Sequence, residues 1–453
     1  MKIKFTILLL FVIHCLCAQD EGRTLEAARL ATIQYGTETE IAALIQTLKT
    51  EGVDYLDNEI ITLVENTRNP RILSGALSFF GEREKSGLEN RAIRAIEERD
   101  SERNETVLAA IDYLGKVKAV NARPVLQKLI EGAERRLANP AIRSLGRISG
   151  GSGVAGNAGA DSAETAAYLI DFYEKSSPDD ESRREIVVAL GAAGSVTAVE
   201  FLAGIASNGG EKATLRIAAL DSLAKIGDPG GLNAVIECVS ADDSNLRAAA
   251  VTALGPFSGS AVDEAILDAF RDSFYRTRSA AAHASRQRKL AAAVPYLKFR
   301  AERDEVPAVR EDAVRALGAI ADGEAIKVLE ALFTERKNND RVRIVAGEML
   351  MQIQSDQYLD KLVMELDEAK QKSQTALYNG LLKVIGTTKG SNMEAITRRL
   401  MQNSGVIERS YALDMAVNNN LTGLTEEVKV IAKDRNESIA AKARRTLEKW
   451  GVQ

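Results

Sequence analysis

The chain has 453 residues, 45% of them hydrophobic and 27% charged, so it can bury a substantial core and is not disordered by composition. Its formal net charge of −5 argues against bulk nucleic-acid binding. The chain holds 2 His and 3 Cys, and His14, Cys15 and Cys17 all lie near its start. Because His283 and Cys238 alone cannot build a His-rich metal site or a disulfide, we expect no metal, no cofactor and no redox catalysis.

Residues 1–18 have the order of a secretory signal peptide: Lys2 and Lys4, then an apolar run from Phe5 to Val12, then a short segment ending at Ala18. We predict cleavage after Ala18 and export to the periplasm or the extracellular space. Loss of the two lysines changes the formal charge from −5 to −5 − 2 = −7. A retained anchor or a lipid-modified cysteine are the alternatives, although the apolar run is shorter than the ~20 residues of a spanning helix. No membrane span is expected after signal removal.

An internal repeat organises the middle of the chain. An aliphatic-Arg pair is followed by Ala three residues after the Arg and by Leu four residues later, as in Val309-Arg310 with Ala313 and Leu317. A degenerate copy has Thr277-Arg278 with Ala281 and Ser285. We predict that these arginines form a structural ladder that stabilises the stack, with exposed Arg-Asp pairs that each add little. Its members are Arg183, Arg216, Arg247, Arg310 and Arg343.

Each unit reads as a helical hairpin. Apolar residues spaced like Val309, Ala313, Val314 and Leu317 follow the 3.6-residue helical period, and a second amphipathic segment precedes each such stretch. About twelve units fill residues 54–450, and residues 19–53 are expected to form an irregular N-terminal helical cap. Stability should come from stacked hydrophobic faces.

The motif resembles HEAT-type repeats, and especially the short HEAT-like form found in bilin lyases. The segment from Ala313 to Gly318, preceded by Val309-Arg310 and by Asp304 in the turn, is close to the family pattern. The resemblance implies an all-α, right-handed superhelical solenoid of about twelve helical hairpins. It also implies that the second helices line the concave face and that a turn Asp bonds a helix Arg between repeats.

A glycine-rich stretch at residues 149–162 lengthens one repeat. Its run from Gly151 to Gly156 matches the GxGxxG dinucleotide fingerprint, but a repeat helix precedes it instead of the strand that this fingerprint requires. We therefore predict a flexible insertion in the solenoid, which could act as a contact flap.

Basic side chains gather in residues 271–303, where Ser285-Arg286 replaces the Leu-Gly of other units. A repeat that gives up packing for polar groups is a candidate contact site. A degenerate unit with a solvated basic face is the competing interpretation. The candidate partner-binding residues are Arg276, Arg278, His283, Arg286, Arg288 and Lys289.

The sequence favours a non-enzymatic, exported binding scaffold that holds a protein or peptide on the concave face of the solenoid. Because no second histidine, GxSxG elbow or phosphate loop accompanies His283, no catalytic residue is assigned. Two alternatives stay open: an enzyme or enzyme accessory of the HEAT-like lyase type, and a binder of an anionic polymer through residues 271–303.

Overall fold

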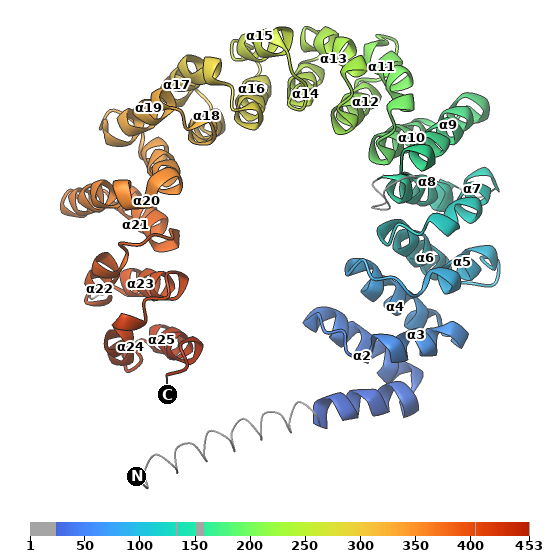
Figure 1. Ribbon diagram of the computed structural model, residues 1–453, viewed down its shortest axis with the longest axis horizontal. Helices are drawn as coiled ribbons and strands as arrows, with labels where there is room; N and C mark the ends of the chain where they lie inside the picture. Colours follow the sequence, from blue (N-terminus) through green and yellow to red (C-terminus); the bar gives the residue numbers. More distant parts are fainter. Residues whose placement is uncertain (1–23, 133–134, 151–157, 404, 453) are drawn as a thin grey trace. The chain divides into compact units, whose positions relative to one another are not determined.

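The computed structural model describes residues 24–132, 135–150, 158–403 and 405–452. The predicted signal peptide and the GxGxxG stretch lie outside these ranges. The chain divides into two compact units, one ending at Gly231 and one beginning at Leu232. Within the described ranges all regular structure is helical, as predicted (Figure 1).

Both units are built from helical hairpins in which a first helix is followed by a second helix. The first helices of unit 1 are α3 (Asp57–Asn66), α5 (Glu89–Glu97), α7 (Arg123–Gly132), α9 (Ala158–Ser176) and α11 (Val199–Ser207). The second helices of unit 1 are α4 (Pro70–Glu82), α6 (Asn104–Lys116), α8 (Arg135–Ser149), α10 (Asp180–Ala193) and α12 (Ala213–Ile226). Successive second helices pack on one another and form a layer.

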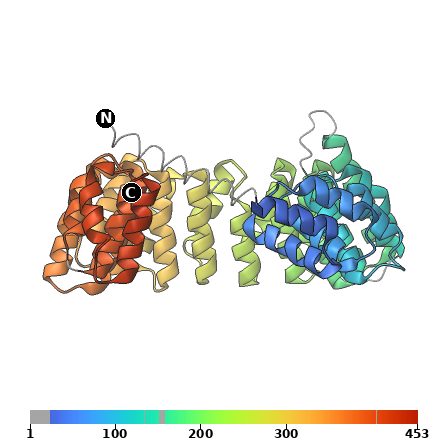
Figure 2. The ribbon, with the colours of Figure 1, turned by 90° about the horizontal axis from the view of Figure 1, so that it is seen from below.

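Unit 2 repeats this arrangement, and Figure 2 shows its helices, from yellow to red, side by side. Its first helices are α13 (Leu232–Val239), α15 (Ser260–Ala269), α17 (Val294–Arg303), α19 (Gly323–Thr334), α22 (Glu394–Met401) and α24 (Thr425–Ile431). Its second helices are α14 (Ser244–Ala253), α16 (Tyr275–Arg288), α18 (Pro307–Ile320), α21 (Thr375–Thr387), α23 (Val406–Asn418) and α25 (Glu437–Lys449). The long α20 (Asp340–Gln371) serves as the second helix of one hairpin and the first helix of the next.

Five hairpins from α3 to α12 and seven from α13 to α25 make the twelve that the sequence predicted for residues 54–450. Where an irregular cap was predicted, residues 24–35 form a helix and α2 (Glu38–Glu51) packs on α4 like a second helix. The N-terminal segment therefore has the form of one more hairpin.

Local chemistry sets the helix ends. Asp179 accepts a hydrogen bond from the Ser182 backbone N–H and caps α10, which ends at Gly194 in the left-handed region (φ 70°). Short 3-10 turns then lead into several first helices: η1 (Val120–Ala122), η2 (Val196–Ala198), η3 (Pro229–Gly231), η4 (Ala291–Ala293) and η5 (Thr422–Leu424). Hydrophobic side chains such as Val309, Val314 and Leu317 are fully buried between the layers.

Two elements differ from the repeat predicted for them. Residues 158–162, predicted to belong to a flexible insertion, form the first turns of α9, where Asp161 pairs with Arg123 of α7. In α20 no turn separates the two hairpins, and only Gln354 departs from helical geometry (φ −150°, ψ 79°). Tyr358 is buried at the position where η2 and η4 bury the small Ala198 and Ala293, and a kinked helix stands here in place of the compact turn.

The glycine that follows the repeat leucine allows close packing of second helices. A Cβ added to Gly146 of α8 would lie 2.5 Å from the carbonyl oxygen of Ala189 in α10 and 2.8 Å from its Cα. These are backbone atoms, which cannot rotate away as a side chain could. The Leu-Gly motif therefore sets the spacing between repeats.

We predict that Gly146→Ala lowers the free energy of unfolding by about 1–3 kcal/mol, because the new methyl group overpacks the contact with α10. The matched control is Gly204→Ala in α11, where a Cβ would meet nothing within 4 Å. That change should raise stability by about 0.5–1 kcal/mol through helix propensity. Urea unfolding followed by circular dichroism measures both, and equal effects of the two changes would contradict the close-packing role.

Candidate functional site

The predicted contact residues of α16 and its C-terminal end lie in three different environments. Arg278 is buried, and Arg288 turns toward α15, where it pairs with Asp263. Arg276, His283 and Arg286 lie on the exposed side of the helix, and Lys289 is the exposed residue at its C-terminal end. Arg278 and Arg288 are thus assigned to packing between helices and not to the contact surface.

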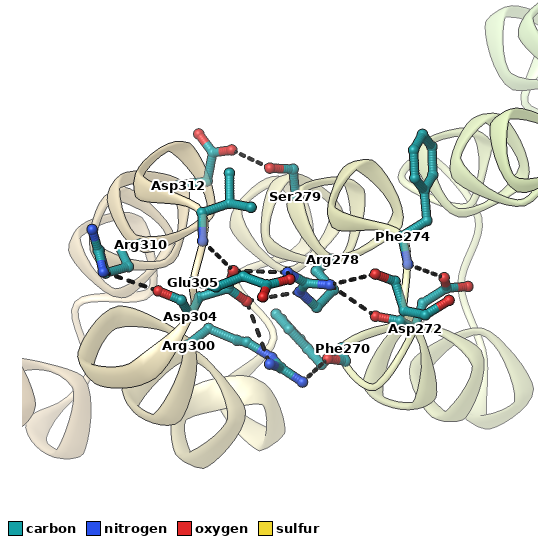
Figure 3. Close-up of polar contacts among 12 residues, drawn as sticks. Phe270, Asp272, Phe274, Arg278, Ser279, Arg300, Asp304, Glu305, Arg310 and Asp312 are labelled. Carbon is teal, nitrogen blue, oxygen red and sulfur yellow. Dashed lines mark hydrogen bonds and ion pairs between the residues drawn. The ribbon is translucent and has the colours of Figure 1, made fainter.

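Arg278 forms a buried ion pair with Asp304, the first residue after α17 (Figure 3). Its Nε and Nη2 donate to the two carboxylate oxygens over 2.7 and 2.8 Å. Its Nη1 donates to the backbone carbonyls of Asp272 and Ser273, which lie in the turn before α16. Side-chain exposure is 5% for Arg278 and 0% for Asp304, so this pair is not the solvated contact that the sequence suggested.

Arg247 repeats the pattern one unit earlier. It pairs with Asp272 over 2.7 and 3.1 Å and donates to the carbonyls of Ala241 and Asp242 in its own turn. The Asp272 carboxylate also accepts a hydrogen bond from the Phe274 backbone N–H at 2.7 Å (Figure 3). This second bond orients the carboxylate toward Arg247. Each such arginine therefore ties its own turn to the turn of the following repeat.

The ladder continues with other partners. Arg183 donates to the Tyr173 hydroxyl and pairs with Glu211, and Arg216 donates to the carbonyl of Ala206. Arg310 donates to the backbone carbonyl of Asp304 at 3.0 Å, and Arg343 donates to the carbonyl of Phe333 and pairs with Glu365. The periodic arginines share a position between repeats, while the group that each one holds varies.

The ion pair sets the ionisation of Asp304. Burial, the largest influence, would raise the pKa of this carboxyl, but hydrogen bonds from Arg278 and from the Val306 N–H outweigh it and hold the pKa below its usual value. Asp304 stays ionised in the folded protein and keeps Arg278 neutralised.

The buried side of α16 contains no large apolar side chain. It consists of Thr277, Arg278, Ala280, Ala281, Ala282, Ala284 and Ser285. The hydroxyls of Thr277 and Ser285 are buried and find no hydrogen-bond partner among the described residues. Alanine side chains bury little apolar area, so hydrophobic burial stabilises α16 less than its neighbours. The packing of α16 therefore depends more on the ion pair between Arg278 and Asp304.

The exposed side of α16 carries one stripe, which we call the α16 stripe: Arg276, Ser279, His283 and Arg286, spaced three, four and three residues apart. Ser279 donates to Asp312 of α18 at 2.6 Å, and His283 lies 3.5 Å from the same carboxylate. Asp312 raises the pKa of His283 through this contact, and burial opposes the effect. Arg276 donates to the Asn245 side chain and the Tyr275 hydroxyl and lies 5.9 and 5.8 Å from the ring centroids of Phe274 and Tyr275.

Neighbouring second helices are joined by ion pairs at several other steps: Arg147–Asp112, Arg143–Glu185, Arg341–Glu311, Arg315–Glu348 and Lys442–Asp414. The step from α14 to α16 differs. One repeat before Arg276, Ser279 and His283, α14 has Asn245, Ala248 and Thr252, none of them charged.

Arg286 occupies the repeat position at which the neighbouring units have a close-packing glycine. These glycines are Gly255, just after α14, and Gly318, within α18. No ion pair forms between Arg286 and any carboxylate in the described ranges, and the same holds for Lys289 and Arg276. Arg276 and Arg286 of the α16 stripe, and Lys289 beside it, are therefore exposed cations without a carboxylate partner in the described ranges, whereas His283 and Ser279 contact Asp312.

The sequence did not point to Asp263 or Asp312. Asp312 belongs to the next repeat and lies 312 − 283 = 29 residues from His283, whereas Asp263 lies 25 residues before Arg288, on the first helix of the same hairpin. A search for opposite charges about one repeat apart would have found Asp312 but not Asp263. Without the fold, these carboxylates could not be matched to the cations of the basic segment.

Comparison with protein families identifies the repeat. The model of the Spirochaete HEAT repeat protein family matches residues 33–446. The chain belongs to this family. Its twelve hairpins are HEAT repeats, and the arginine ladder is the polar contact between them. No curated protein matches the chain significantly.

Solved HEAT-repeat solenoids are similar at low identity. The karyopherin Kap121p, bound to the extreme C-terminus of the phosphatase Cdc14p, is 12% identical with a TM-score of 0.43; the match covers 92% of this chain and 53% of Kap121p. The chain thus spans about half the length of that protein. The CpcE–CpcF phycocyanin lyase of Nostoc sp. PCC7120 is 18% identical (TM-score 0.34, 53% of this chain and 92% of that chain). Human deoxyhypusine hydroxylase is 19% identical (TM-score 0.26, 60% and 97%).

Two further properties of the HEAT solenoid bear on its chemistry. Among the described residues, no three His, Cys, Asp or Glu side chains are grouped so that they could hold a metal ion. No helix in the described ranges is both long enough and apolar enough to span a bilayer.

We predict that Arg278→Ala destabilises unit 2 by about 3–5 kcal/mol, because it leaves the buried Asp304 carboxylate without its main partner. Arg310→Ala removes a hydrogen bond to one backbone carbonyl and should cost about 1 kcal/mol. Thermal unfolding and hydrogen exchange of the α16 and α18 amides measure the two variants. Equal losses would show that Arg278 is an ordinary ladder member.

We also predict an acid-dependent difference between the wild-type chain and Asp304→Asn. Because the folded-state pKa of Asp304 is lowered, its contribution is complete above its ordinary pKa of about 3.9 and is lost as the pH falls through the folded value. The variant should be less stable at pH 7, and the gap between the two midpoints should narrow below about pH 4. A gap that is constant from pH 7 to pH 3 would contradict the assignment.

Proposed function

We propose that this protein is an exported, non-enzymatic scaffold that holds a protein or peptide partner on its layer of second helices. In this proposal the α16 stripe, extended by Lys289 at the helix end, anchors acidic side chains of the partner. Membership in a HEAT repeat family supports binding of proteins in general. Export rests on the sequence of residues 1–18, which lie outside the described ranges.

The observation that carries the anchor is the step from α14 to α16. Arg276, Arg286 and Lys289 are exposed, and no carboxylate of the described residues pairs with them. Exposed cations in an acidic protein attract an acidic partner from a distance and orient it during encounter. Protonation of His283 would add a further positive charge to the same stripe.

The geometry around His283 supports binding and not nucleophilic catalysis. Ser279, His283 and Asp312 are the residue types of a hydrolase triad, but here the aspartate lies between the other two. A triad needs the histidine between serine and aspartate, so that the imidazole accepts the hydroxyl proton. The Ser279 hydroxyl donates a hydrogen bond to Asp312, and no hydrogen bond joins Ser279 to His283.

We predict that combined charge reversal at the three cations, Arg276→Glu, Arg286→Glu and Lys289→Glu, slows partner association at least ~10-fold at low salt and leaves helix content unchanged. The matched control reverses three exposed cations that also lack ion pairs in the described ranges, Lys433, Arg435 and Arg445. Both sets change the net charge equally, so only position separates them. The difference should fade at 1 M salt, where the Debye length is about 3 Å.

The measurement begins with affinity capture from the exported fraction, using the wild-type, reversed and control chains as baits. A partner retained by the wild-type and control chains but lost from the reversed chain is then studied by association kinetics over a salt series. Equal retention by all three baits would refute the anchor. Recovery of a polyanion in place of a protein, with the same loss on reversal, would favour the anionic-polymer alternative.

A further inference from the structure

An aromatic pocket lies on the first-helix layer of unit 2, between the end of α15 and the helix α17. Its volume is about 390 Å³, and it is lined by Phe270, Arg271, Pro295, Tyr296, Phe299 and Arg300. The volume is at the lower end of the ~300–1,000 Å³ range of ligand pockets, which suits one large side chain and its flanking backbone.

The aromatic walls are held in place before any ligand arrives. The rings of Phe270 and Tyr296 stack with centroids 5.7 Å apart, and Arg271 lies 5.3 Å from the Tyr296 centroid while donating to its hydroxyl at 3.2 Å. Phe270 is buried, but Phe299 is 52% exposed, the highest value among the described phenylalanines. An aromatic ring left in water beside a concave apolar wall is a typical anchor site for a partner.

The base of the pocket holds the guanidinium of Arg300, which shares its carboxylate partner with a second arginine. Arg300 donates to the backbone carbonyl of Phe270 and lies 3.3 Å from Asp304, whose carboxylate also neutralises Arg278 (Figure 3). One buried carboxylate thus serves two guanidinium groups. Burial, the largest influence, lowers the pKa of Arg300, as expected for a cation that is desolvated and only partly compensated.

The pocket lining contains two arginines, which differ in how they are neutralised. Arg271 pairs with Asp268 at 2.6 Å. Arg300 lies 3.3 Å from Asp304, a carboxylate that it shares with Arg278. The pocket therefore combines apolar walls with one partly neutralised cation, Arg300.

We propose that this pocket binds a short acidic peptide segment of a partner protein, which inserts one aromatic or leucine-sized side chain against Phe299 and places a carboxylate toward Arg300. The apolar walls account for the inserted side chain, and the partly neutralised guanidinium of Arg300 accounts for the acid. This site is separate from the α16 stripe, and it goes beyond the scaffold proposal by specifying a side-chain anchor.

The test uses the full chain and three fluorescein-labelled pentapeptides measured by fluorescence anisotropy. The first has the sequence Gly-Phe-Asp-Glu-Gly, the second replaces Phe by Ala, and the third replaces both acids by Lys. We expect saturable binding of the first peptide and at least tenfold weaker binding of the other two. Phe299→Ala should weaken binding of the first peptide at least tenfold, whereas Lys298→Glu, a charge reversal outside the pocket lining, should weaken it far less.

The control variant is Met364→Ala, which truncates another exposed apolar side chain, 71% exposed, on the first-helix side of α20. It should bind the first peptide with wild-type affinity. Both Phe299 and Lys298 are exposed, and circular dichroism checks that their variants keep the wild-type helix content.

Three results would overturn the proposal: no saturable binding of the first peptide, unchanged affinity in Phe299→Ala, or equal binding of all three peptides. The chain with reversed Arg276, Arg286 and Lys289 separates the two sites. If that variant loses the peptide while Phe299→Ala retains it, the acidic segment occupies the α16 stripe and the pocket proposal is wrong.

Discussion

The buried ion pair between Arg278 and Asp304 is the contact on which the middle of unit 2 depends. Charges with 5% and 0% exposure are costly unless each finds its partner, and here the pair also satisfies two carbonyls of the preceding turn. A stack of similar hydrophobic faces has little to fix its register. An arrangement that separated Arg278 from Asp304 would leave a buried charge unpaired, so the ladder specifies which turn meets which helix.

The same contact explains how α16 packs in the stack although its buried side chains are small or polar. Its buried positions hold alanines, Thr277 and Ser285 where α18 buries Val309, Val314, Leu317 and Ile320. Less apolar area leaves water on α16 than on its neighbours, so less hydrophobic stabilisation is available there. The bidentate pair, together with Asp312 bonded to Ser279 and His283, connects α16 to the following repeat instead.

The repeat and its helices could be read from the sequence because they depend on local periodicity, whereas the close packing at glycines such as Gly146 is known only from the structure. The partners of the charges could not be read either, because they lie on other helices and turns. Arg278 looked like part of a basic surface, yet Asp304 lies 26 residues away, in the next turn, and buries it. Arg288 was assigned to the contact surface although it pairs with Asp263, which lies 25 residues earlier on the first helix of the same hairpin. The repeat pattern also gave no sign of the kinked helix α20, in which Gln354 alone departs from helical geometry.

Asp304 also links the two surfaces proposed to bind partners. Its carboxylate holds Arg278 of α16 on one side and Arg300 of the aromatic pocket on the other (Figure 3). Arg300 in turn bonds the Phe270 carbonyl, which belongs to a wall of that pocket. The α16 stripe lies on the other side of the helix that Arg278 holds. One carboxylate therefore supports the packing behind both surfaces, and its loss would disturb both.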